Sequence, residues 1–319
     1  MRELLRITIS LALLGAVFWL LETLFPSRPG QLKWRRGIKT DLMYWVFTPL
    51  VTKFITRFTV SALLLLGVVA VLGREAVPRI AMQGYGPVST WPSWLQAIGA
   101  FVIGDFIGYW MHRLFHGARL WPFHAVHHSS TEVDWLSAVR LHPVNDILAR
   151  VAQAVPLLLL GFPATVLAVY VPFISFYAIL LHANVSWSFG PLRYLLSSPR
   201  FHRWHHTTER EGLDKNFAGF FPLWDLLFGT FYMPRDQQPQ TFGVLRNDVP
   251  QGLIGQLWYP FNRRHVKHFP SIHLEIVHEN HGTALSNPKS VAGCSGPRGH
   301  GCSFLQDRCA EILSWYQTR

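Results

Sequence analysis

The chain has 319 residues, of which half are hydrophobic and only 15% are charged. Soluble proteins carry about 25% charged residues, so the composition argues against a soluble protein and favours a membrane protein. A net charge of +11 would suit a nucleic-acid-binding protein. However, the basic residues lie beside apolar runs, as in residues 28–39, and form no recognisable nucleic-acid module. Such flanks are typical of membrane-helix ends and of contact with lipid headgroups, so we predict no nucleic-acid partner.

Two apolar runs come first. Residues 4–25 are long enough to cross a bilayer as a helix. A cleaved signal peptide is disfavoured, because the run is too long and no small-residue cleavage site follows it. The basic loop 28–39 separates this run from the second, residues 44–72. Because Lys53 and Arg57 interrupt the second run, its first part is the weaker membrane-helix candidate.

The third apolar run, residues 94–111, leads directly into a pair of histidines. Asp105, Tyr109, His112 and His116 follow one another at helical spacing and would form one stripe on a helix. A carboxylate at membrane depth is energetically costly and is therefore a candidate functional residue. We expect Asp105 to orient a metal ligand or to line the substrate path. The alternative is a charge at a helix end that snorkels to water.

A fourth apolar stretch, residues 147–181, contains the break Gly161-Phe162-Pro163. Proline interrupts a helix and a nearby glycine favours a turn, so we predict two helices rather than one. A hairpin of this kind would return the chain, at His182, to the side that carries the earlier histidines.

Nine histidines sit in compact motifs or at a membrane edge. His112 and His116 form HxxxH, and two HxxHH triplets lie on either side of the lone His182. On a helix, positions i, i+3 and i+4 share a face, so each triplet should direct its imidazoles into one small volume. The candidate metal ligands are His112, His116, His124, His127, His128, His142, His182, His202, His205 and His206.

So many imidazoles exceed what a single four-coordinate zinc can use, so we predict two metal ions. Imidazole suits iron, copper, nickel and zinc alike, and the ligand type does not choose among them. His142 is either a tenth ligand or the cap of a helix that begins at Pro143. Nearby carboxylates are expected to orient imidazoles rather than to bind metal, namely Asp105, Glu132, Asp146, Glu209 and Asp225.

The order of these motifs, followed by Trp-Asp-x-x-Phe-Gly-Thr at 224–230, resembles the fatty acid hydroxylase/sterol desaturase superfamily over about residues 95–235. The stretches 127–130 and 215–230 are also similar to alkylglycerol monooxygenase, and 141–144 to sterol C5-desaturases. Where some relatives have a second histidine after the lone one, this chain has Ser186. The resemblance implies two iron ions, O₂, a lipid substrate from the bilayer and an electron donor of the cytochrome b5, ferredoxin or reductase type.

The fold expected from these features is an all-α, multi-pass membrane bundle with a cytosolic, histidine-rich di-metal cap. We predict N-terminal membrane helices and basic loops in residues 1–93, a catalytic domain in 94–235 and a basic C-terminal segment in 236–319. The histidines would face the cytoplasm, in a bacterial inner membrane or the endoplasmic reticulum. From about residue 279 the chain is rich in Gly, Ser, Pro and Asn, and we expect a flexible tail.

The predicted activity is O₂-dependent hydroxylation or desaturation of a sterol or fatty-acyl lipid, with no catalytic residue beyond the metal centre. An ether-lipid or carotenoid hydroxylase is the alternative on the same scaffold. A membrane metal transporter or metal-binding protein is a different class that also uses many histidines. It is disfavoured because the sequence lacks the repeated membrane halves that many transporters show. A zinc site in the tail, built from His300 and the three cysteines, matches no standard spacing.

Overall fold

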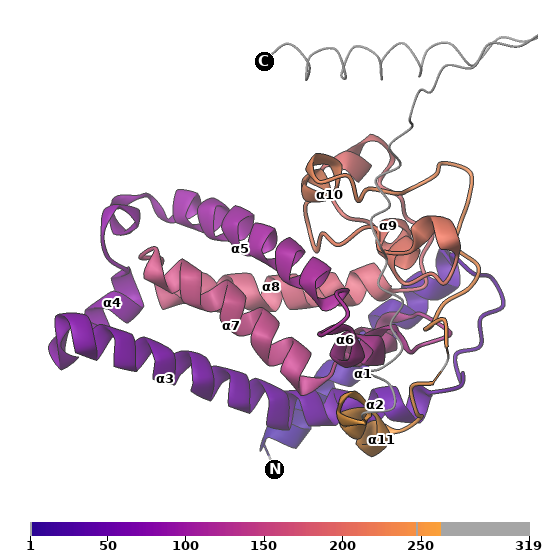
Figure 1. The fold of residues 1–319 in the computed structure, drawn as a ribbon, viewed down its shortest axis with the longest axis horizontal. Helices are drawn as coiled ribbons and strands as arrows, with labels where there is room; N and C mark the ends of the chain where they lie inside the picture. Colours follow the sequence, from indigo (N-terminus) through magenta and orange to yellow (C-terminus); the bar gives the residue numbers. More distant parts are fainter. Residues whose placement is uncertain (1, 247, 263–319) are drawn as a thin grey trace, which may run out of the picture. The chain divides into compact units, whose positions relative to one another are not determined.

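The structure, a computed structural model, describes residues 2–246 and 248–262. Within these ranges the chain forms helices and no strand, so the predicted all-α fold is confirmed (Figure 1). The predicted tail lies outside the described residues. The α-helices are α1 (Arg2–Leu24), α2 (Ile38–Phe47), α3 (Lys53–Leu72), α4 (Val77–Gln83), α5 (Ser93–Phe115), α6 (Trp121–His128), α7 (Pro143–Leu159), α8 (Ala164–His182), α9 (Pro199–His205), α10 (Leu223–Leu227) and α11 (Leu253–Trp258).

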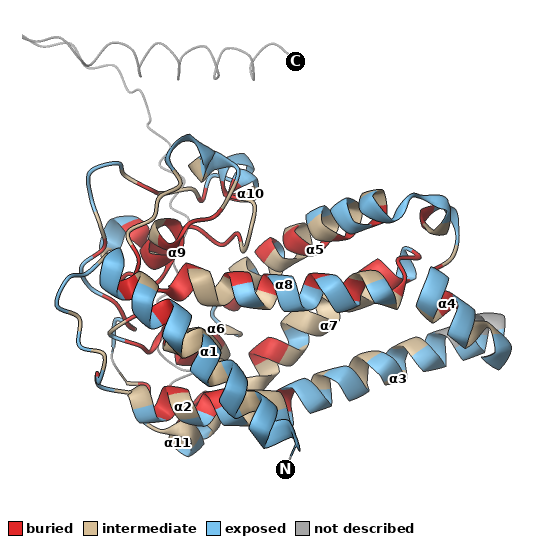
Figure 2. Cartoon of the chain, turned by 180° about the vertical axis from the view of Figure 1, so that it is seen from behind, coloured by how far each residue is buried: buried red, intermediate tan, exposed pale blue. Residues whose placement is uncertain are grey.

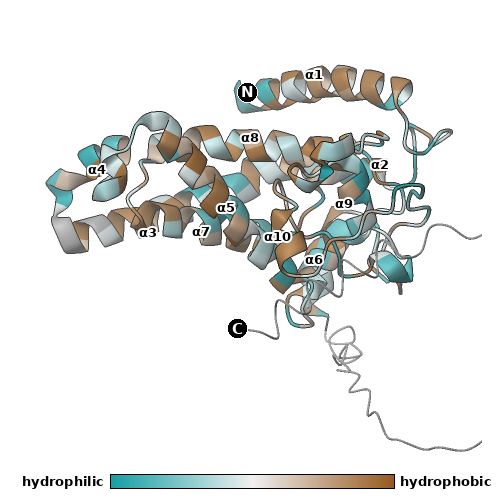
Figure 3. Cartoon of the chain, turned by 90° about the horizontal axis from the view of Figure 1, so that it is seen from above, coloured by the Kyte–Doolittle hydropathy of each residue, from teal (hydrophilic) through white to brown (hydrophobic). Residues whose placement is uncertain are grey.

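In the part of the chain that the structure describes, three helical segments are long and apolar enough to cross a membrane: Arg2–Leu24, Ile38–Gly67 and Ala164–His182. Their outer faces carry large apolar side chains, and Leu13, Phe54 and Phe58 are 64%, 68% and 69% exposed. Figure 2 shows α1 and α3 as largely exposed helices, and Figure 3 shows that much of this surface is hydrophobic. Exposed apolar surface of this extent is expected where a protein contacts lipid.

The second apolar run forms a longer helix than its charges suggested. The π-helical turn Thr48–Thr52 joins α2 to α3 without a break, and Pro49 lies inside it. Proline has no N–H to donate, so the regular hydrogen-bond ladder cannot continue through this position. A π-helical turn, which is wider than an α-helical turn, accommodates the missing hydrogen bond. Such turns are frequent at functional sites.

Residues 143–182 form the predicted hairpin, and that expectation is confirmed. Helix α7 ends at Leu159, α8 begins at Ala164, and Gly161 in the turn has φ +96°. A Cβ on Gly161 would lie 2.1 Å from the carbonyl oxygen of Tyr85. Only glycine therefore allows the turn to pack this closely against the chain that follows α4.

The histidine-bearing ends of the helices meet at one end of the bundle. Helices α5 and α8 run toward this end, where they carry His112 and His182, and α7 runs away from it (Figure 1). The short helices α6 and α9 and the 3₁₀ turn η4 (Trp135–Val139) lie at the same end. We call this region the cap. One of its apolar cores joins α5, α9 and the chain around α10 through Tyr109, Phe201, Trp204, Phe217, Ala218 and Met233.

A buried ionic network connects the basic N-terminal loop to the cap. Arg35 donates to both carboxylate oxygens of Asp134, at 2.6 and 2.5 Å, and to Asp41 at 2.7 Å. Arg140 donates to the other oxygen of Asp41 at 2.6 Å. All four side chains are at most 7% exposed. Their charges balance formally, two positive against two negative, which is what burial of ion pairs requires.

Candidate metal centre

The structure brings nine of the ten predicted ligands together in two clusters. Within each cluster the candidate ligand nitrogens lie within 4.8 Å of one another. The five-histidine cluster is formed by His112, His116, His124, His128 and His205. The four-histidine cluster is formed by His127, His182, His202 and His206.

Each HxxHH triplet is divided between the clusters, which corrects the expectation that its three imidazoles share one volume. His124 and His128 belong to the five-histidine cluster, and His127 belongs to the other. In the second triplet the division is reversed: His202 and His206 stay together, and His205 crosses over. At 3.6 residues per turn, i and i+4 are only about 40° apart, whereas i+3 and i+4 are about 100° apart. The i, i+4 pair therefore serves one cluster, and i+3 serves the neighbouring one.

Hydrogen bonds to Nδ1 fix the orientation of many of these rings. Backbone carbonyls accept from Nδ1 of His112 (Phe217, 2.7 Å), His127 (Arg140, 3.1 Å), His182 (Ala178, 2.7 Å) and His205 (Lys215, 2.8 Å). Because a carbonyl oxygen only accepts, the proton of a neutral ring must sit on Nδ1. The other nitrogen, Nε2, then carries a lone pair.

These Nε2 atoms converge. His182 Nε2 lies 3.1 Å from Nε2 of each of His127, His202 and His206. In the five-histidine cluster, His124 Nε2 lies 3.1 Å from that of His112 and 3.2 Å from that of His128.

Burial also keeps these rings neutral, since it lowers the pKa of His124, His127 and His205 well below the usual value. Neutral rings whose lone pairs face one another repel unless a cation lies among them. With metal–nitrogen bonds of about 2.1 Å, neighbouring ligand nitrogens stand about 3.0 to 3.4 Å apart. The observed spacings fit that range. The buried Nε2 atoms of His116 and His205 also have no hydrogen-bond partner among the described residues, which suits ligand atoms.

His142 is not brought to either cluster, so the expectation that it is a tenth ligand is corrected. Its Nδ1 accepts a hydrogen bond from the backbone N–H of Val144, which makes it the N-cap of α7. Its Nε2 lies 3.2 Å from the carbonyl oxygen of Leu257. Both ring nitrogens therefore have hydrogen-bond partners outside the clusters. His142 has the alternative role that the sequence allowed, the cap of a helix.

The five carboxylates expected to orient imidazoles do not hydrogen-bond the clustered rings in the described part of the chain. Asp105 instead accepts from the backbone N–H groups of Phe220 and Phe221 and from the indole of Trp224, each at 2.9 Å. It is 3% exposed, so it does not snorkel to water either. Its role is to fix the α10 region of the cap to α5.

Asp225 is linked to the His112 ring through one peptide unit. Its carboxylate accepts from the N–H groups of Phe217 and Ala218, both at 2.8 Å, and the carbonyl of Phe217 accepts from His112. The Asp225→Asn variant would turn an amide N–H₂ toward these donors and disturb the acceptor of His112. We expect metal affinity to fall about 10-fold or more. Competition with a calibrated chelator measures this fall, and the exposed Asp236→Asn is the matched control. Equal affinities in the two variants would contradict this role.

Sequence reasoning missed the direct partners of the imidazoles, both side chains and backbone carbonyls. Asn145 Oδ1 lies 2.7 Å from His124 Nδ1, Asp214 Oδ1 lies 2.9 Å from His116 Nδ1, and Arg140 supplies its carbonyl to His127. Asn145 follows His142-Pro143 at the start of a helix, and that position was its only signal in the sequence. A backbone carbonyl leaves no signal at all, because every residue has one.

Comparisons with known proteins show which enzymes this chain is similar to. Residues 97–230 match the fatty acid hydroxylase family. An ornithine lipid hydroxylase of Rhizobium tropici is 33% identical over 190 residues, 59% of this chain and 57% of that protein. Human alkylglycerol monooxygenase is 37% identical over 142 residues, 44% of this chain and 32% of its own length. A very-long-chain aldehyde decarbonylase of Oryza sativa subsp. japonica is 30% identical over 200 residues, 59% of this chain and 27% of its own.

The chain thus spans little more than half of the length of the first relative and a third or less of the length of the other two. No solved structure matches it. The matched segment holds all nine clustered histidines and the carboxylates that fix the cap above them. On these grounds residues 97–230 resemble the fatty acid hydroxylase family.

Proposed function

We propose that the protein is a membrane-bound di-iron oxygenase that hydroxylates or desaturates a lipid. The observation that carries this proposal is the pair of converging imidazole clusters at one end of a helical bundle with membrane-spanning character. The family and its lipid-oxidising relatives support it. Imidazole ligands are compatible with iron, and zinc, which has no redox chemistry, would not serve this reaction.

The nine clustered histidines would hold the two metal ions, one ion in each cluster. Two iron ions bound there would supply the oxidation of an unactivated C–H bond by O₂, with two electrons from a donor protein and two protons. In a hydroxylation one oxygen atom of O₂ would enter the product and the other would leave as water, and in a desaturation both would leave as water. The chain itself orients the imidazoles through the Nδ1 acceptors described above. It also excludes water: the ring of Phe217 lies 4.9 Å from that of His116, and Trp121 lies 5.1 Å from the same ring. Positioning and exclusion of water are the protein's share in such chemistry.

The basic flanks of the membrane helices favour a cytoplasmic cap, so we also propose that the electron donor docks from that side. An ether lipid is the second candidate substrate, and the similarity to alkylglycerol monooxygenases favours it. Supplying matched alkylglycerol and fatty-acyl lipids to the purified enzyme with a reductant separates the two substrates.

The proposal predicts about two iron ions per chain in active protein, one for each cluster. Elemental analysis of protein purified without chelators, together with O₂ uptake and lipid product analysis, checks this. Full activity with one ion or fewer per chain would contradict the two-metal centre. Metal uptake into vesicles without O₂ consumption would instead indicate a transporter. Zinc recovered from an overexpressing host does not count against iron, because zinc competes for imidazole sites.

A further inference from the structure

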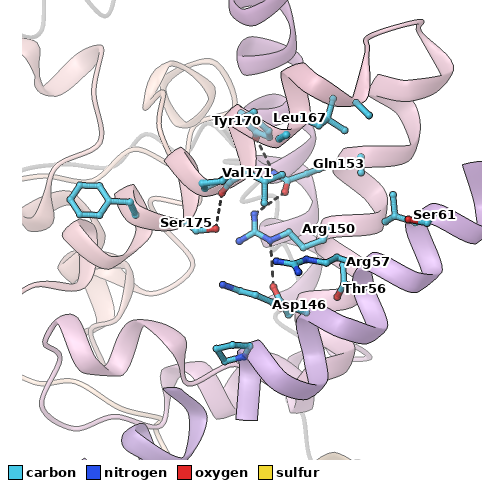
Figure 4. Close-up of a pocket in the computed structure, with 18 of the residues that line it drawn as sticks. Thr56, Arg57, Ser61, Asp146, Arg150, Gln153, Leu167, Tyr170, Val171 and Ser175 are labelled. Atoms are coloured by element: carbon cyan, nitrogen blue, oxygen red, sulfur yellow. Dashed lines mark hydrogen bonds and ion pairs between the residues drawn. The ribbon is translucent and has the colours of Figure 1, made fainter. Parts of the chain in front are cut away.

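A cavity of about 790 Å³ lies apart from the histidine clusters, between α1, the helix formed by α2 and α3, α7 and α8 (Figure 4). Its volume is within the usual range for small-molecule sites, about 300–1,000 Å³. No clustered histidine lines it. The three segments with membrane-spanning character all contribute to its walls.

Most of the wall is apolar, with Leu64, Leu157, Leu158, Leu167 and Ile179 among the lining residues. Leu157, Leu158 and Leu167 also belong to the apolar core near the turn between α7 and α8. This part of the cavity has the chemistry of an acyl-chain site.

One part of the cavity is cationic. Lys53 and Arg57 from α3 and Arg150 from α7 line it, and the carboxylate of Asp146 is close to Lys53 and Arg150. We call these three side chains the cationic cluster. Arg150 Nε lies 3.5 Å from Asp146 Oδ1, and Figure 4 shows the guanidinium of Arg57 beside that of Arg150. Three cations face one anion, so the cluster carries an excess of positive charge.

Positive charge between membrane helices is energetically costly unless an anion accompanies it. A snorkelling role is the alternative, in which each side chain reaches water independently. It accounts poorly for Arg150, whose side chain is only 28% exposed and is directed among Asp146, Gln153 and Arg57. Gln153 is itself tied to the carbonyl of Gly104 on α5, at 3.0 Å. Arg150 is therefore held in place by contacts within α7 and, through Gln153, by α5, whereas Lys53 and Arg57 are exposed.

We propose that this cavity binds a lipid with an anionic headgroup, a phosphate or a carboxylate, held by Arg57 and Arg150, with its acyl chain along the apolar wall. Guanidinium groups bind both anions with paired hydrogen bonds, and charge complementarity selects them over neutral headgroups. The proposal rests on the proposed function, because it names the class of lipid that the oxygenase takes from the bilayer.

The cavity also determines the orientation of the bound lipid. Asp146 beside the cationic cluster follows Asn145, which contacts His124 of the five-histidine cluster. The headgroup end of the cavity therefore lies at the histidine end of α7, and the apolar part extends toward the turn between α7 and α8. A lipid bound this way has carbons near its headgroup, rather than its distal methyl end, closest to the metal centre.

Native mass spectrometry of the full, metal-loaded chain in neutral detergent tests the proposal with three probes. Phosphatidylglycerol carries a phosphate, oleate carries a carboxylate and diacylglycerol carries no charge. We expect at least one anionic probe to bind about tenfold more tightly than diacylglycerol, and whichever of the two is retained identifies the headgroup chemistry. Arg57→Gln with Arg150→Gln should remove that preference and leave diacylglycerol binding and metal content unchanged.

The matched control is Arg74→Gln with Arg79→Gln, which removes the same charge from exposed positions that do not line the cavity. It should keep the preference. The Arg57→Lys, Arg150→Lys double variant keeps both charges but loses the paired hydrogen bonds of a guanidinium group. It should keep part of the preference for anionic probes. Equal binding of all three probes by the unmodified chain, or an equal loss in the control, would overturn the anion site. Because the assay measures binding, a chain that selects anionic lipids but oxidises none refutes only the proposed function.

Discussion

Replacing His206 with alanine should abolish lipid oxidation and lower bound metal from two ions per chain to about one. His206 Nε2 lies 3.1 Å from both His182 Nε2 and His202 Nε2, so its removal leaves the four-histidine cluster with three ligands. Loss of a residue that merely orients a metal ligand typically lowers affinity or activity 10- to 100-fold. Loss of the ligand itself should therefore exceed about 100-fold. Turnover and elemental analysis at matched protein levels measure both effects.

The control for this experiment is His142→Asn. His142 is a buried histidine on the same side of the bundle, but it caps α7 instead of joining a cluster. Asparagine is a good N-cap, so this variant should keep both metals and most activity. The parallel variant His205→Ala leaves four imidazoles in the five-histidine cluster and should lose activity while retaining more metal than His206→Ala. The two-cluster assignment fails if His206→Ala keeps full metal while His142→Asn loses it.

Replacing Asp41 with asparagine should strongly destabilise the folded chain. Asp41 lies between Arg35 and Arg140, and the variant leaves two buried guanidinium groups with a single carboxylate, Asp134. Breaking a buried ion pair in this way costs about 3–5 kcal/mol. For a chain of this size the midpoint of thermal unfolding should fall by about 6–20 °C. Metal affinity should also fall, because the carbonyl of Arg140 accepts from His127.

Thermal unfolding in detergent, followed by circular dichroism and chelator competition, measures both effects. Glu3→Gln breaks an ion pair whose side chains are 72% and 66% exposed, and it should leave the midpoint unchanged. Removing both partners, Asp41→Leu with Arg140→Met, should restore part of the loss, since no buried charge is then left unpaired on that side. An Asp41→Asn midpoint equal to that of Glu3→Gln would show that the network contributes nothing to stability.

The sequence predicted the features that depend on local periodicity. Spacing identified the nine histidines that converge, and Gly161-Phe162-Pro163 identified the turn that returns His182 to them. It did not predict the division of each triplet between clusters, because that requires the path of both helices. Nor did it predict the role of Asp105, whose partners Phe220 and Phe221 are 115 and 116 residues away. Contacts over such separations come from tertiary packing, which the periodicity of residues along the sequence does not predict.

The ionic network also constrains the order of events during synthesis. Arg35 leaves the ribosome 99 residues before its partner Asp134, and Asp41 leaves 99 residues before Arg140. At translation rates of about 5–20 residues per second, these partners follow about 5–20 s later. Throughout that interval the early charges keep their hydration, since burying them unpaired would cost several kcal/mol each. The N-terminal loop therefore settles onto the cap only after the chain through Arg140 has emerged, so the first part of the protein to be made is among the last to be locked in place.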